Sequence, residues 1–119
     1  MAEFVAQEEM SRMTGYWWAN DESKIAFTRV DESPVKEAIR NEIYADEVKL
    51  FNQRYPFTGT NNVDIQLGVV KLNDQAVDWI DLGDDKDIYI ARAKWLNDSN
   101  TLSYQWQNRS QHNLELRFY

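Results

Sequence analysis

An internal repeat constrains the fold of this 119-residue chain more strongly than any other feature of its sequence. A tryptophan, a polar turn and an apolar segment near the N-terminus recur 77 residues later. The first copy contains Trp18, Asn20, Asp21, Ile25, Ala26 and Phe27, and the second contains Trp95, Asn97, Asp98, Leu102, Ser103 and Tyr104. Because self-similarity at a fixed offset marks a repeat architecture, this unit predicts a β-propeller blade of four antiparallel strands. A plain blade takes about 40 to 50 residues, so 77 is too long for one plain blade.

The interval between the two copies supplies the other strands of the first predicted blade. Strands are expected at residues 16–18, 24–29, 64–72 and 77–82. The residues that remain are polar and charged at both ends and contain both prolines of the chain. We therefore predict one long blade over residues 16–82, with an insertion at about residues 31–63.

The rest of the chain predicts part of a second blade and one helix. Three further strands are expected at residues 91–95, 101–106 and 114–119. They form most of a blade over residues 90–119, and the chain ends before a fourth strand. Phe4–Met13 consists mainly of good helix formers, which predicts a helix of two or three turns within residues 1–15. The predicted fold is all-β: a partial propeller of about two blades with a short N-terminal helix.

Open sheet faces are a consequence of such a partial propeller. Adjacent residues in a strand point to opposite faces, so Trp17 and Trp18 together need both faces of their sheet to be covered. A closed propeller provides that cover on every blade, whereas two blades alone leave faces and strand edges unpaired. We therefore expect the isolated chain to self-associate.

Charge and composition exclude several classes of function. The net charge of −7 repels the phosphates of nucleic acids, so no nucleic-acid partner is expected. No apolar run approaches the roughly 20 residues of a membrane helix, and the first 30 residues lack the order of a signal peptide. The absence of cysteine excludes disulfides and thiolate chemistry, but it leaves the cellular location undecided.

Six segments together resemble the propeller domain of the dipeptidyl peptidase IV family, especially its bacterial members. They are Gln7–Met10, Gly15–Trp18, Ile25–Phe27, Asp31–Val35, Ile43–Asp46 and Arg54–Pro56 with Gly59. The resemblance implies a piece of the N-terminal β-propeller of a serine-type peptidase that removes X-Pro or X-Ala dipeptides. A bacterial parent protein that is periplasmic or exported is also compatible with this resemblance. Ala19–Glu22 departs from the Ser-Pro-Asp-Gly turn that is frequent in the family, which puts only the turn type in doubt.

Catalytic residues are not expected in this chain. The resemblance places the Ser, Asp and His of the family on a downstream α/β-hydrolase domain. No serine here lies in a Gly-x-Ser-x-Gly elbow, and the single histidine, His112, has no recognisable catalytic partners. The chain alone should therefore be inactive, and no catalytic residue and no cofactor is predicted.

Glu8 and Glu9 are the one candidate binding site. The resemblance implies that this pair binds the protonated N-terminus of the peptide substrate. Neighbouring helix positions lie about 100° apart, so two flexible glutamates can converge on one ammonium group. That group is mostly protonated at neutral pH and has three N–H donors. Without the resemblance, the pair would be read as a solvated helix face.

The acidic residues Asp81, Asp84, Asp85 and Asp87 lack the spacing of an EF-hand, so we interpret them as a solvated turn and predict no metal. The alternative function is a stand-alone β-rich module that binds another protein and has no peptidase role. A downstream Gly-x-Ser-x-Gly elbow would favour the peptidase.

Overall fold

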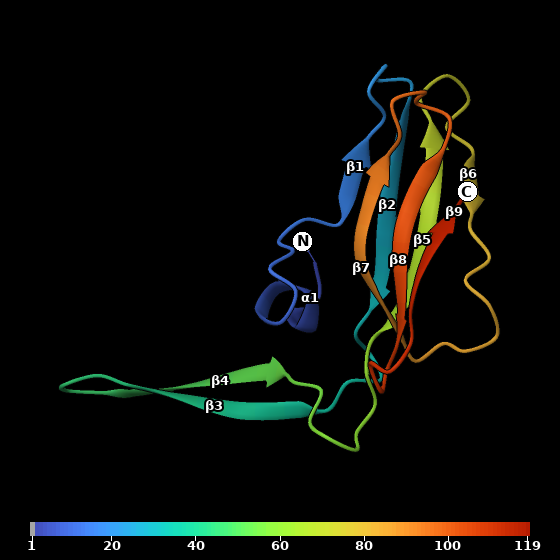
Figure 1. Ribbon diagram of the computed structural model, residues 1–119. Coiled ribbons are helices and arrows are strands. Elements are labelled where there is room, and N and C mark those ends of the chain that lie inside the picture. The colour runs from blue at the N-terminus through green and yellow to red at the C-terminus, as the bar shows by residue number, and fades with distance from the viewer. Residues whose placement is uncertain (1) are drawn as a thin grey trace.

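The computed structural model describes residues 2–119, which form one short helix and nine strands (Figure 1). The helix is α1 (Phe4–Glu8). The strands are β1 (Tyr16–Trp18), β2 (Lys24–Asp31), β3 (Glu37–Ile43), β4 (Val48–Arg54), β5 (Asp64–Lys71), β6 (Val77–Trp79), β7 (Ile88–Trp95), β8 (Leu102–Asn108) and β9 (Leu114–Phe118). The predicted all-β class with a short N-terminal helix is confirmed. Among residues 2–119, no helix has the length and apolar character needed to cross a membrane.

The first sheet contains four antiparallel strands in the order β1-β2-β5-β6. Trp17 lies opposite Ala26 and Trp18 lies opposite Ile25, so the two tryptophans point to opposite faces, as their spacing predicts. Trp17 packs against the core, whereas Trp18 is 49% exposed. One face of this sheet is therefore covered and the other is open.

The open face of the first sheet has a close aromatic contact. The rings of Phe27 and Trp79 meet edge to face with their centroids 5.6 Å apart. Gly68 lies directly opposite Trp79 in the sheet, and a Cβ atom at Gly68 would lie 3.0 Å from the indole ring. Glycine is needed here because it leaves the space that the Trp79 ring occupies.

The second sheet has the order β7-β8-β9 and packs face to face on the first (Figure 1). Buried side chains alternate along β8 at Leu102, Tyr104 and Trp106, which is the period of a strand with one covered face. On the first sheet, Leu67 and Val69 lie in the same core. This shared core, between the two sheets, supplies most of the apolar burial of the molecule.

The turns of the two repeat copies lie against each other at one end of the sheets. The side-chain amide of Asn20 donates a hydrogen bond to the carbonyl oxygen of Leu96 at 3.0 Å. The indole N–H of Trp95 donates to the carbonyl oxygen of Trp17, also at 3.0 Å. The residues that reveal the repeat in the sequence therefore also join its two copies in space.

The predicted insertion contains a β-hairpin that the sequence patterns did not reveal. Strands β3 and β4 pair with each other in a separate two-stranded sheet and project from the body of the molecule (Figure 1). Ile39, Ile43 and Leu50 are each at least 67% exposed. Within the part of the chain that the structure describes, no second layer packs on these apolar residues, so the hairpin is not constrained to the regular alternation from which strands are predicted.

Candidate functional site

Helix α1 carries the glutamate pair that the sequence analysis selects. The helix has five residues and ends at Glu8, so the expected helix over residues 4–13 is too long. Glu9 is the C-cap residue, with φ −96° and ψ −28°, and its backbone is still in the right-handed helical region. Two residues later, Ser11 has φ +50°, a left-handed conformation with which a helix cannot continue.

The carboxylates of Glu8 and Glu9 face solvent. Both residues are exposed, and neither side chain forms an ion pair or a hydrogen bond within residues 2–119. Consecutive residues with helical backbone angles direct their side chains about 100° apart, so the two flexible chains can reach one point between them. The pair can therefore accept hydrogen bonds from a single cationic group.

A helix of this length needs contacts with the rest of the molecule, because isolated helices shorter than about 12 residues are marginal in water. Ala6 is completely buried. The ring of Phe4 meets the ring of Tyr55, at the base of the hairpin, with centroids 5.0 Å apart. The backbone N–H of Ala2 donates to the carbonyl oxygen of Met13 at 3.2 Å, which closes the helical segment into a loop.

A buried ion pair lies inside this loop. One guanidinium nitrogen (Nη2) of Arg12 lies 3.1 Å and 3.3 Å from the two carboxylate oxygens of Glu3. The other (Nη1) donates to the carbonyl oxygen of Thr14 at 2.7 Å, and the guanidinium lies 5.8 Å from the centre of the Trp17 ring. Glu3 is 2% exposed and Arg12 is 6% exposed. Neither residue could be selected from the sequence, because nothing in a sequence pattern marks two charged residues as buried.

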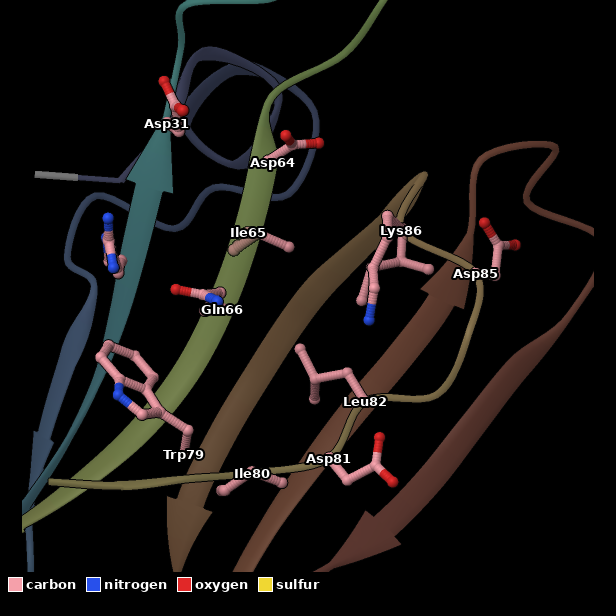
Figure 2. Close-up of a pocket in the computed structure, with 12 residues that line it drawn as sticks. Asp31, Asp64, Ile65, Gln66, Trp79, Ile80, Asp81, Leu82, Asp85 and Lys86 are labelled. Atoms are coloured by element: carbon pink, nitrogen blue, oxygen red, sulfur yellow. The ribbon is translucent and has the colours of Figure 1, made fainter.

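A second candidate site is a hollow of about 400 Å³ beside strands β2, β5 and β6. Figure 2 shows its walls, with the side chains of Trp79 and Leu82 on either side of the opening. Its charged lining consists of four carboxylates and two cations: Asp31, Asp64, Asp81, Asp85, Arg29 and Lys86. No sequence pattern marks this hollow, because it depends on Asp31 of β2 lying opposite Asp64 of β5, 33 positions along the chain.

The aspartates around this hollow mainly build turns. The backbone N–H of Ser33 donates to Asp31 at 2.9 Å, and this bond and the Ser33 side chain hold the Asp31 pKa below its ordinary value. Asp81 accepts a hydrogen bond from the backbone N–H of Gly83. Asp85 accepts one in the same way from the residue two positions later. Within residues 2–119, no three His, Cys, Asp or Glu side chains gather into a group that could hold a metal ion.

Comparison with known proteins gives a match along the whole chain. The family model for the dipeptidyl peptidase IV N-terminal region matches residues 1–119. Dipeptidyl aminopeptidase A of Saccharomyces cerevisiae is 28% identical over 120 residues, and this alignment covers 95% of the chain. It covers only 12% of the yeast protein, so the chain spans a small part of that relative's length.

Solved structures give the same result for the fold. The crystal structure of Porphyromonas gingivalis dipeptidyl peptidase 4 superposes with a TM-score of 0.88 at 26% identity, over 98% of this chain and 17% of that one. A protein from Bacteroides ovatus, described as a dipeptidyl aminopeptidase IV, gives a TM-score of 0.75 at 28% identity, over 88% of this chain and 15% of that one. The predicted partial propeller is confirmed by this likeness.

Proposed function

The chain belongs to the family of dipeptidyl peptidase IV N-terminal regions, and we propose that its Glu8–Glu9 pair binds the protonated N-terminus of a peptide substrate. The observation that carries the proposal is a pair of exposed carboxylates that have no partner within residues 2–119, at the end of a helix that buries Ala6. Charge-assisted hydrogen bonds of this kind contribute about 1.5 to 3 kcal/mol each.

Amine binding at a fixed point would also set which peptide bond is cleaved. With the substrate ammonium held by Glu8 and Glu9, only the bond two residues from the free end reaches a nucleophile at a fixed distance. We propose that this nucleophile belongs to an α/β-hydrolase domain of a longer serine peptidase that releases X-Pro or X-Ala dipeptides. In that protein, the present chain contributes recognition and not bond cleavage.

The arrangement of strands supports a division into blades. We propose that residues 16–82 form one blade, with the hairpin of β3 and β4 inserted at about residues 31–63, and that residues 90–119 form most of the next. The sheet order β1-β2-β5-β6 supports this division, because the insertion interrupts the sequence of the blade but not its sheet. Residues 1–15 then form a separate segment that holds the glutamate pair.

The uncovered sheet faces support a proposal about association. We propose that the isolated chain self-associates through the face of the first sheet that bears Trp18 and through its unpaired strand edges. The face that bears Trp17 does not contribute, because the second sheet covers it.

The test of amine recognition is made in the full-length peptidase. Glu8→Gln and Glu9→Gln keep the shape of the side chains and remove one charge each. We expect each substitution to lower kcat/KM for release of a dipeptide from a free-amine substrate by about tenfold or more. Glu22→Gln is the matched control, because Glu22 is exposed on the turn between β1 and β2 and should leave kcat/KM unchanged.

A second substrate separates amine binding from a general loss of activity. A peptide acetylated at its N-terminus has no ammonium group, so wild type should process it poorly and the variants should process it no worse. The reaction of the catalytic serine with a small electrophile that carries no amine should keep its wild-type rate. If Glu8→Gln and Glu9→Gln release free-amine dipeptides as fast as wild type, the pair is a solvated helix face.

A further inference from the structure

We infer that the buried Glu3–Arg12 ion pair is a positioning element that holds the Glu8–Glu9 carboxylates at the place where they meet the substrate ammonium. This inference rests on the proposed function, because it assigns Glu3 and Arg12 an effect that passes through the glutamate pair. Neither residue contacts substrate in the proposal, since both are buried.

Helix α1 cannot determine its own position. Its five residues are far too few for a stable isolated helix. Glu3 occupies the N-cap position but forms no capping hydrogen bond with its side chain. Both of its carboxylate oxygens are instead directed to Arg12, nine residues along the chain. The acidic group at the start of the helix is thus used to connect the helix to the segment that follows it.

Arg12 holds several parts of the loop in place at once. Its side chain bonds Glu3 before the helix and Thr14 after it, and its backbone N–H donates to the carbonyl oxygen of Ala6 within the helix at 2.8 Å. Its guanidinium also lies near the ring of Trp17, on the first strand of the sheet. These contacts surround the short segment that contains Glu8 and link it to the propeller core.

Hydrogen bonds to a planar guanidinium depend on direction more strongly than apolar contacts do. The Phe4–Tyr55 contact joins the helix to the base of the hairpin at one point, and a single contact does not by itself fix the rotation of the helix about its axis. The bonds of Arg12 to Glu3 and Thr14 restrict that rotation. Because Glu8 and Glu9 must converge on one ammonium, a small rotation of the helix changes how well they bind it. Misplacement by about 1 Å is enough to lower a rate by two orders of magnitude.

The test is a double-mutant cycle in the full-length peptidase. Glu3→Gln keeps the size and the hydrogen-bonding capacity of the side chain but removes its charge, and Arg12→Lys keeps the charge but loses the planar fork. We expect each change to raise KM for a free-amine dipeptide substrate about tenfold, with a smaller change in kcat. Arg40→Lys is the control, because Arg40 forms a solvent-exposed ion pair with Glu42 on the hairpin and should leave KM unchanged.

The decisive comparison is made after the glutamate pair has been removed. In a Glu8→Gln/Glu9→Gln background, Glu3→Gln and Arg12→Lys should have no further effect on KM, because residues that act through one another are not additive. A loss of the same size in both backgrounds would show a general structural role and would overturn the inference. Loss of serine labelling by the amine-free electrophile in both positioning variants would overturn it as well.

The proposed function and this inference fail in different ways. If Glu8→Gln and Glu9→Gln leave KM and kcat unchanged, the proposed function is wrong. If those variants raise KM while Glu3→Gln and Arg12→Lys do not, amine binding stands and only the positioning role is wrong.

Discussion

Two aspartates in equivalent positions of the repeat build the turns by the same means. Asp98 accepts hydrogen bonds from the backbone N–H groups of Asn100 and Thr101, each at 3.0 Å. Asp21 accepts bonds from the hydroxyl and the backbone N–H of Ser23, at 2.8 Å and 3.1 Å. These bonds favour the ionised carboxylate, so they hold the pKa of both aspartates below the ordinary value of 3.8. The repeat therefore conserves a turn chemistry as well as a strand pattern between its two copies.

This lowered pKa predicts a pH dependence for the turn at Asp98. The stabilisation by the carboxylate is complete above the unfolded pKa of about 3.8, and it is lost as the pH falls through the lower folded pKa. We expect Asp98→Asn to remove the part of the acid-induced loss of stability that comes from this turn. Tryptophan fluorescence during titration below pH 4 measures it, because Trp95 precedes the turn. An identical acid titration for wild type and variant would contradict the assignment.

The glutamate pair and the ion pair behind it differ in how far sequence could predict them. Glu8 and Glu9 could be selected because a resemblance to a family gives two adjacent acidic residues a role. Glu3 and Arg12 could not, since their burial depends on a loop that closes only in three dimensions. Charged residues are expected at the surface, and a pattern gives no reason to place these two inside.

At the scale of elements, the strands of the two sheets that pack on each other are the ones that the sequence predicts. Strand β5 buries Ile65, Leu67 and Val69 at alternate positions, and its predicted bounds differ from the observed ones by one residue. The hairpin of β3 and β4 has no covered face, so its sequence is free of the constraint that produces alternation. Helix α1 is shorter than predicted because residues 10–13 include good helix formers, whereas the left-handed backbone of Ser11 prevents the helix from continuing.

The contact between the two sheets predicts unequal effects for two buried tryptophans. The indole N–H of Trp95 donates to the carbonyl oxygen of Trp17 on the other sheet, whereas the indole N–H of Trp106 is buried without an acceptor in residues 2–119. We expect Trp95→Phe to lower the free energy of unfolding by about 0.5 to 1.5 kcal/mol more than Trp106→Phe does, because it removes a hydrogen bond between the two sheets. Urea denaturation of the two variants measures the difference. Equal losses of unfolding free energy would mean that the hydrogen bond of Trp95 does not stabilise the contact between the sheets.

At the scale of the whole molecule, the two sheets cover each other on one side only. The first sheet exposes Tyr16, Trp18 and Trp79 on its outer face. The second sheet exposes Leu114, Leu116 and Phe118 along β9 on the side away from the core. In a closed propeller, neighbouring blades would cover both faces.

These open faces predict that the isolated 119-residue chain associates with itself. The molar mass from light scattering should rise with protein concentration, because contact between outer faces removes apolar surface from water. Trp18→Lys combined with Leu116→Lys should lower the mass toward that of the monomer, since it places a charge on each outer face. A monomer at high concentration, with the same mass for wild type and the double variant, would contradict the expectation.

The hairpin of β3 and β4 leaves the first sheet at Asp31 and returns at Asp64, and these two residues are direct cross-strand partners. A segment whose two ends are already neighbours can be lengthened, shortened or exchanged without moving the strands that receive it. Insertions and deletions between Asp31 and Asp64 should therefore cost the first sheet little stability. The four strands of the first sheet can keep their arrangement while the length and sequence of the hairpin vary.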